Sequence, residues 1–496
     1  MHTAAMAASM GGMMGEHSTG PWAAIRRVAA SDRISGLIML GFALMGLVLA
    51  NVPATAAWFE HLSHAELGIP GTNISMGIGH WAQDGLLTIF FLVVGLELKQ
   101  ELTAGSLSNI RAAAVPMLCA VGGMIVPPVL FIAVIALFSR YGAGDPGSLL
   151  IANGASFPFS EASHGWAIPT ATDIAFSLAV LALFAKALPG SIRAFLMTLA
   201  TVDDLLAIIL IAVFFSSLNA WYWFVGIAVC ALAWYFLVRM RKVRWFGVAV
   251  IGVLSWVMMY EAGVHPTLAG VLVGLLTPAR AMYGERDARA ERYADKLQPF
   301  SALLALPIFA FFATGVQFDA ITPMLLVSPV VIGIIVALVI GKPLGIMAVA
   351  WCSTHLGSLR MPKGLRVRDM FPAAVACGIG FTVSFLIASL AYRNAELSAE
   401  GRFGVLLASL LAAAVSGVLL SRQSKRFERA AADAGTAGQD AQQDAGRVQT
   451  TLADGTVVLS QSIGGGKRKE PTDGVAADTG TSARRTRTRG GERPRR

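Results

Sequence analysis

Charged side chains are scarce in this sequence. Asp, Glu, Lys and Arg make up 14% of its 496 residues, hydrophobic residues make up 55%, and the mean hydropathy is +0.64. A soluble globular domain carries about 25% charged residues. The composition therefore excludes an ordinary soluble domain and predicts a polytopic membrane protein.

Cysteines and the short motifs of common enzymes are also scarce. The four cysteines fall within apolar runs or at their ends, so we interpret them as small apolar residues and not as a disulfide framework. HExxH, CxxC, P-loop and G-x-S-x-G motifs do not occur in a context that would support enzyme chemistry. We therefore expect a protein that is not an enzyme and has no cofactor.

Long apolar runs dominate instead. A helix of about 20 apolar residues crosses the hydrocarbon core of a bilayer. The runs do not alternate as barrel strands do, so we expect helices, about twelve of them, in an all-α polytopic fold. The predicted spans are 35–53, 83–99, 112–138, 166–185, 194–217, 219–238, 245–261, 265–279, 299–317, 325–351, 371–392 and 403–421.

The positions of lysine and arginine give the expected orientation. Cytoplasmic loops are enriched in these residues. The loops assigned to the opposite side hold only Arg140, Arg393 and Arg402. The loops on the first side hold 20, namely Arg26, Arg27, Arg33, Lys99, Arg111, Lys186, Arg193, Arg239, Arg241, Lys242, Arg244, Arg280, Arg286, Arg289, Arg292, Lys296, Arg360, Lys363, Arg366 and Arg368. We therefore expect both termini in the cytoplasm, and the lipid bilayer as the surrounding partner.

The two ends of the chain differ from this apolar body. Residues 1–30 lack a long apolar core, so we expect a flexible cytoplasmic leader before a transmembrane domain at 31–421. From Arg422 onward, 15 basic and 9 acidic residues give +6 of the net charge of +9. Large apolar residues are few there, so we expect a disordered basic cytoplasmic tail at 422–496. Because this tail holds most of the basic excess, we expect no nucleic-acid partner.

Two predicted spans are interrupted near mid-depth. The fourth contains Pro169-Thr170-Ala171-Thr172-Asp173, and the eleventh contains Cys377-Gly378-Ile379-Gly380-Phe381-Thr382. Proline removes a helix hydrogen bond, and paired glycines weaken a helix. The interrupted span is the middle one in both spans 3–5 and spans 10–12. This pattern predicts inverted repeats, with an ion site where two discontinuous helices meet. Two ordinary kinks are the alternative.

Deep ionisable residues are limited to Asp173, Asp203, Asp204 and Lys342. A charge at mid-bilayer costs about 3 kcal/mol on insertion scales, and such residues commonly mark ion or proton pathways. Neighbouring helix residues point about 100° apart, so Asp203 and Asp204 need separate partners, and Lys342 offers one. A hard cation such as Na⁺ prefers carboxylate and hydroxyl oxygens. The cluster therefore predicts competition between Na⁺ and H⁺ for one site, with a purely structural ion pair as the alternative.

Other residues are candidates for smaller roles. Asp173 is placed to offset the positive ends of half-helices, and Thr172 could add a hydroxyl oxygen. Glu97 and Glu101 lie at the cytoplasmic end of the second span, where they would attract cations or fix the helix end. For His265, at an outward helix start, we expect capping or packing.

Seven stretches occur in one order between about residues 30 and 421. They are Phe-Phe-Leu-Val-Val-Gly-Leu-Glu-Leu-Lys-Gln-Glu-Leu (90–102), Gly-Gly-Met-Ile-Val-Pro (122–127), Gly-Trp-Ala-Ile-Pro-Thr-Ala-Thr-Asp-Ile-Ala-Phe (165–176), Val-Asp-Asp-Leu (202–205), Gly-Val-His-Pro-Thr-Leu-Ala-Gly-Val-Leu-Val-Gly (263–274), Gly-Lys-Pro-Leu-Gly-Ile (341–346) and Gly-Ile-Gly-Phe-Thr (378–382). Together they resemble the NhaA-type bacterial Na⁺/H⁺ antiporters.

The resemblance implies a secondary antiporter of the bacterial inner membrane. It would export Na⁺ or Li⁺ and import two protons per ion, electrogenically, for Na⁺ and pH homeostasis. It would form a homodimer through an outward hairpin, and the loop at 54–82 has turn residues that suit one.

The resemblance also implies roles for individual residues. Asp204 would carry Na⁺ and protons, and Asp203 would lie beside the transported Na⁺ and pair with Lys342. Thr172 and Asp173 would shape the site, and Asp84 would lie in the periplasmic approach. The stretch Tyr293–Gln298 departs from the family because it lacks histidine, so pH regulation through an acid–histidine cluster there is not implied.

Two other functions remain open from the sequence. One is a Na⁺-coupled symporter of an organic anion with the same architecture. The other is a non-transporting membrane sensor or scaffold that uses the tail. Two adjacent acids together with a membrane lysine favour the antiporter.

Overall fold

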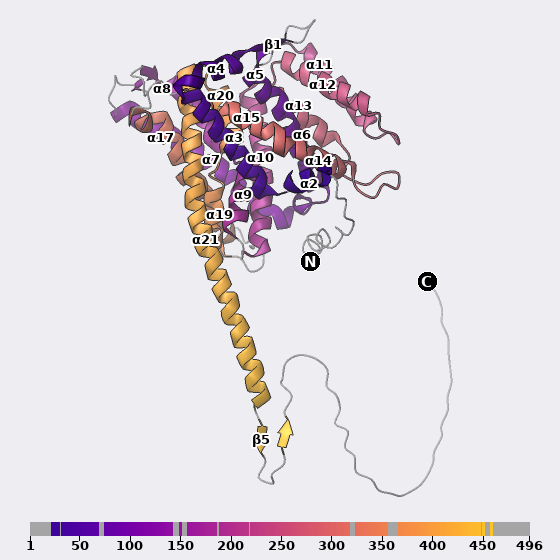
Figure 1. The fold of residues 1–496 in the computed structure, drawn as a ribbon, viewed down its shortest axis with the longest axis vertical. Coiled ribbons are helices and arrows are strands. Elements are labelled where there is room, and N and C mark those ends of the chain that lie inside the picture. The colour runs from indigo at the N-terminus through magenta and orange to yellow at the C-terminus, as the bar shows by residue number, and fades with distance from the viewer. Residues whose placement is uncertain are drawn as a thin grey trace. The chain divides into compact units, whose positions relative to one another are not determined.

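Helices make up most of the structure (Figure 1). The computed structural model describes residues 21–29, 31–68, 74–141, 148–150, 156–185, 188–217, 219–317, 323–355, 366–447, 449–451 and 457–459. Within these ranges, seven helices are long and apolar enough to cross a membrane, or up to nine if each of two bent helix pairs is one span. The chain is therefore a largely helical, multi-pass membrane protein.

The helices follow one another with short connections. In the first half they are α2 (Pro21–Ala29), α3 (Asp32–Asn51), α4 (Pro53–His64), α5 (Ile78–His80), η1 (Trp81–Leu86), α6 (Leu87–Thr103), η2 (Ser106–Ser108), α7 (Ile110–Tyr141), α8 (Phe159–Ser163), η3 (His164–Thr170), α9 (Ile174–Phe184), α10 (Gly190–Phe214) and α11 (Tyr222–Leu237). In the second half they are α12 (Trp245–Glu261), α13 (Leu268–Leu276), α14 (Arg289–Phe300), η4 (Ser301–Ala305), α15 (Leu306–Ala313), α16 (Pro323–Val327), α17 (Pro329–Ile335), η5 (Val336–Gly341), α18 (Lys342–His355), η6 (Val367–Met370), α19 (Phe371–Ala376), α20 (Phe381–Ala391) and α21 (Ala395–Arg447).

Three helices lie where spans were predicted but are shorter than expected. α11 has 16 residues, α12 has 17 and α13 has 9. At 1.5 Å per residue, 16 residues reach only about 24 Å, against a hydrocarbon core of about 30 Å. Hydropathy counts apolar residues whether or not they are helical. Here Gly263, with a φ of +75°, lies in the turn between α12 and α13.

Two bent helix pairs stand at the interrupted sequences. Phe159–Thr170 meets Ile174–Phe184 at 50°, and Val367–Ala376 meets Phe381–Ala391 at 57°. Each break leaves four residues or fewer outside the helices. Helix ends are thereby placed in the interior of the bundle, where their free backbone groups need partners.

Close packing of α7 against α18 fixes the position of Lys342, the first residue of α18. A Cβ added at Gly122 of α7 would come within 2.6 Å of the Gly345 carbonyl oxygen in α18. Small residues let membrane helices approach this closely. Gly345 lies one helical turn after Lys342, so the contact sets the height of the lysine in the bundle.

Short strands form three antiparallel hairpins. β1 (Glu66–Gly68) pairs with β2 (Ser75–Gly77), β3 (Ser148–Leu150) with β4 (Ser156–Pro158), and β5 (Gln449–Thr451) with β6 (Val457–Leu459). The first confirms the hairpin predicted within 54–82. The indole of Trp81 donates a 2.8 Å hydrogen bond to the Leu67 carbonyl and holds this hairpin to η1.

The chain divides into two compact units, Met1–Arg429 and Ala430–Arg496. α21 continues past the domain boundary predicted at 421 and is helical to Arg447. Residues 21–29 form α2, although a flexible leader was expected over 1–30. Pro21 opens this helix, a position where its missing N–H costs nothing. The expectations for residues 1–20 and 460–496 lie outside the described residues.

Candidate functional site

Helix α10 carries both central aspartates. Asp203 and Asp204 are buried, with 1% and 7% of their surfaces exposed. Asp203 accepts a 2.8 Å hydrogen bond at Oδ2 from the ammonium of Lys342, which is fully buried. The predicted pairing of these two residues is thus present. The chain positions of the partners differ by 139 residues, so the pair joins α10 to α18.

The ammonium of Lys342 also meets the end of a half-helix. It donates a second hydrogen bond to the carbonyl of Thr170, the last residue of η3. The C-terminal end of a helix carries a partial negative charge. Lys342 follows the π-helical turn η5, a type of turn that is frequent at functional sites. One cation therefore balances a carboxylate and an interrupted helix together.

Asp173 caps two helix N-termini with one carboxylate. Its Oδ1 accepts a 2.9 Å bond from the Phe176 amide in the first turn of α9. Its Oδ2 accepts a 3.1 Å bond from the Thr382 amide in the first turn of α20. The N-cap residue of α20 is Gly380, which has no side chain of its own to offer. The carboxylate thus lies against the positive ends of both half-helices.

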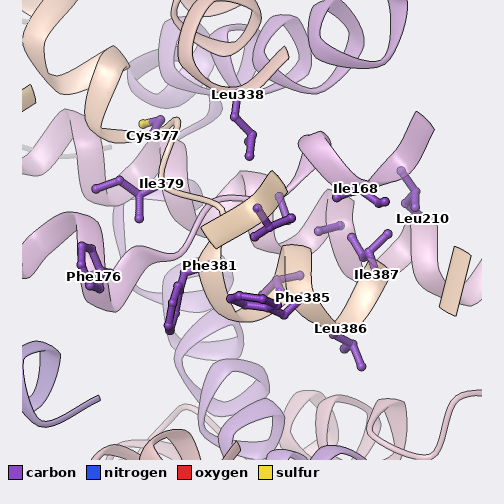
Figure 2. Close-up of a cluster of buried hydrophobic side chains, with 14 of the residues drawn as sticks. Ile168, Phe176, Leu210, Leu338, Cys377, Ile379, Phe381, Phe385, Leu386 and Ile387 are labelled. Atoms are coloured by element: carbon purple, nitrogen blue, oxygen red, sulfur yellow. The ribbon is translucent and has the colours of Figure 1, made fainter. Parts of the chain in front are cut away.

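The two interrupted segments cross and bond to each other. The amide of Asp173 donates a 2.7 Å bond to the Ile379 carbonyl, and the hydroxyl of Thr172 donates a 2.9 Å bond to the Cys377 carbonyl. Figure 2 shows apolar residues around this crossing, including Phe176 and Phe381, whose ring centroids lie 5.8 Å apart. These bonds satisfy backbone groups that the breaks would otherwise leave unpaired.

Asp204 differs from the other acids in its surroundings. In the described part of the chain its carboxylate accepts no hydrogen bond and forms no ion pair, and the Oδ1 atom of Asp203 has no hydrogen-bond partner either. Buried carboxylate oxygens without partners are costly unless a proton or a cation occupies them. Unpaired acidic oxygens beside a neutralised Asp203–Lys342 pair can bind a small hard cation or a proton.

Comparisons with known proteins agree with this geometry. The model of the family described as Na⁺/H⁺ antiporter 1 matches residues 26–144 and 149–420. The chain belongs to this family. It is 73% identical over 455 residues to the Na⁺/H⁺ antiporter NhaA of Bifidobacterium adolescentis, which covers 91% of this chain and 99% of that protein.

Two further relatives carry the same kind of name. The Na⁺/H⁺ antiporter NhaA of Bifidobacterium longum is 77% identical over 413 residues, covering 83% of this chain and 88% of that protein. Na⁺/H⁺ antiporter NhaA 3 of Streptomyces coelicolor is 40% identical over 404 residues, covering 80% of each. The antiporter family is one of transporters, so the resemblance seen in the sequence is confirmed.

The antiporter chain brings Asp84 and His265 together, which the sequence did not indicate. Asp84 lies in the π-helical turn η1, and its Oδ1 is 3.7 Å from Nε2 of His265. The other ring nitrogen of His265 is 2.9 Å from the hydroxyl of Thr267, as expected for a histidine at a helix start. The indole of Trp256 donates a 2.8 Å bond to the Asp84 carbonyl. The two residues lie far apart in sequence, so spacing carried no signal.

Glu97 and Glu101 are one helical turn apart on α6, near its C-terminal end. Glu97 is exposed and Glu101 is half-buried. Their predicted part in a cytoplasmic pathway stays a prediction.

Two further buried charges were missed because they lie near predicted span ends. Glu400 of α21 accepts a hydrogen bond from Ser328, the N-cap residue of α17. Arg289 is fully buried, donates to the Val238 and Met240 carbonyls, and pairs with Glu285 at 2.7 Å. Hydrogen bonds from Arg289 lower the pKa of Glu285. These contacts stabilise helix ends and lie outside the crossing.

Replacing Asp173 by alanine is expected to lower the free energy of unfolding by about 2–3 kcal/mol, because two helix N-termini lose a charged acceptor. Asp173→Asn keeps one acceptor oxygen and should lose roughly half as much. Denaturant titration of the purified protein measures both. Asp369→Ala removes a carboxylate that caps only η6 and is the control. Equal stability of Asp173→Ala and Asp369→Ala would refute the double-capping role.

Proposed function

We propose that this chain is a secondary antiporter that exports Na⁺ or Li⁺ in exchange for protons. The observation that carries the proposal is the unpaired carboxylate of Asp204 beside the Asp203–Lys342 pair, at the crossing of two interrupted helices. The family membership and the names of its relatives support the same ions.

Competition for the same oxygen atoms gives the exchange. Na⁺ would bind Asp204 together with the free Oδ1 of Asp203 and the hydroxyl oxygen of Thr172. That hydroxyl spends its proton on the Cys377 carbonyl and keeps its lone pairs for a cation. A proton on Asp204 cancels the attraction for Na⁺. If the site opens to one side at a time, the two ions move in opposite directions.

The Asp203–Lys342 pair is proposed to handle the second proton. When Na⁺ sits beside Asp203, repulsion from the cation favours loss of a proton from the neighbouring ammonium. Two protons would then exchange for one Na⁺, and one net charge would enter per cycle. At 100 mV this charge contributes about 2.3 kcal/mol to Na⁺ export.

The remaining architectural expectations belong to the same proposal. Twelve spans would form inverted repeats in which the bent pairs are two discontinuous helices, with both termini in the cytoplasm of a bacterial inner membrane. Two copies would associate through the β1–β2 hairpin. Asp84 would lie on the periplasmic pathway, with Glu97 and Glu101 on the cytoplasmic one.

Reversal potentials in proteoliposomes test the stoichiometry. With a tenfold Na⁺ gradient and equal pH on both sides, a two-to-one exchange should halt at an opposing potential of about 59 mV, the value for one net charge. A one-to-one exchange moves no net charge and would not respond to potential. Loss of the response to potential with continued Na⁺-driven proton flux would refute two protons per Na⁺. An absence of proton flux with Na⁺ and Li⁺ would refute the antiporter itself.

A further inference from the structure

Two serines occupy equivalent places on the two half-helices that follow the breaks. Ser177 is the fourth residue of α9, and Ser384 is the fourth residue of α20. Both are buried, with 1% and 0% of their surfaces exposed. Their amides bond to the carbonyls of Asp173 and Gly380, the N-cap residues of their own helices.

Each serine hydroxyl bonds to the other interrupted segment. Ser177 donates a 2.9 Å bond to the carbonyl of Ala376, the last residue of α19. Ser384 donates a 2.8 Å bond to the carbonyl of Ile168 in η3. Each half-helix after a break therefore holds the half-helix before the break of the other pair.

We propose that Ser177 and Ser384 are positioning residues that set the distance between Thr172, Asp173 and Asp204. This inference rests on the antiporter function proposed above and adds two residues to its site. η3 ends at Thr170, whose carbonyl receives Lys342. A shift of η3 therefore moves both the partner of Lys342 and the Thr172 hydroxyl relative to α10.

The two hydroxyls do not contribute equally. The Ala376 carbonyl also accepts a 3.1 Å bond from the Ile379 amide, and Thr172 ties the adjacent Cys377 carbonyl. The described part of the chain offers the Ile168 carbonyl no second donor. Loss of Ser384 therefore leaves a buried carbonyl unpaired, whereas loss of Ser177 does not. The hydroxyl of Ser384 is the more important of the two.

Na⁺ dependence of transport in everted vesicles tests this order. Ser384→Ala should raise the half-saturating Na⁺ concentration about tenfold, because an unpaired buried acceptor costs about 1–3 kcal/mol. Ser177→Ala should raise it less than about threefold. Ser384→Cys keeps a weak donor and should fall between the two. Ser416→Ala is the control, since this buried hydroxyl bonds within its own helix, to Ala413.

Amide hydrogen exchange on purified protein gives a readout that needs no transport. Ser384→Ala should speed exchange at Asp173 and Thr382, whose amides bond across the crossing, and Ser416→Ala should not. A lower unfolding temperature with unchanged Na⁺ half-saturation and unchanged exchange at these amides would overturn the proposal. If Ser384→Ala does not fold, the Na⁺ half-saturation of Ser384→Cys decides, and a value equal to wild type overturns the proposal. A wild-type protein that moves no Na⁺ would refute the antiporter and leave the exchange result standing.

Discussion

Replacing Asp204 by asparagine is expected to abolish Na⁺-driven proton exchange, with a loss of about 100-fold or more, in a protein that still folds. The amide has nearly the shape of the carboxylate but carries no charge and cannot take up a proton at neutral pH. In the described part of the chain the Asp204 carboxylate has no ion-pair partner to leave behind. The substitution therefore removes the cation ligand and leaves no buried charge unbalanced.

Everted membrane vesicles energised by respiration measure the effect. Added Na⁺ or Li⁺ should collapse the pH gradient with wild-type protein and leave it intact with Asp204→Asn. Asp287→Asn makes the same chemical change at an exposed loop position and should behave as wild type. The thermal unfolding temperature of Asp204→Asn should equal or exceed that of wild type. A Na⁺ response within threefold of wild type would rule out Asp204 as the ion carrier.

Replacing Lys342 alone by alanine is expected to destabilise the fold by about 3–5 kcal/mol, the usual cost of breaking one side of a buried ion pair. The substitution leaves Asp203 charged and unpaired, with its Oδ1 already without a hydrogen bond, and it strips the Thr170 carbonyl of its donor. Denaturant unfolding of the purified variant gives the free energy. Lys296→Ala, which removes an exposed ammonium, is the matched control.

Combining Asp203→Asn with Lys342→Ala should recover most of the lost stability, because no unpaired charge remains. The double variant should fold but exchange ions with less net charge per Na⁺, which a smaller response to membrane potential would reveal. Charge movement equal to that of wild type would show that the pair carries no proton. Stability no better than that of Lys342→Ala would show that unpaired Asp203 is not the cause of the destabilisation.

Local pattern was enough to identify the residues of the candidate site. Hydropathy placed Asp203 and Asp204 in the middle of an apolar run, and Pro169 with Gly378 and Gly380 marked where two spans are interrupted. These signals survive in the sequence because burial cost and helix breaking act on adjacent residues. The helix count was less accessible. α11–α13 are apolar throughout but short, and turn geometry at Gly263, which hydropathy does not register, lies between α12 and α13.

The sequence by itself thus determined which charges are buried and where the helices break. Only the tertiary structure decided which groups meet: Asp173 caps α20 as well as α9, Asp84 lies beside His265, and Ser384 holds the Ile168 carbonyl. These partners lie far apart along the chain, 216 residues in the case of Ser384 and Ile168. A helix period relates residues a few positions apart and carries no information across such distances. The fold chooses the partners because every polar group inside the bilayer must find one within the protein.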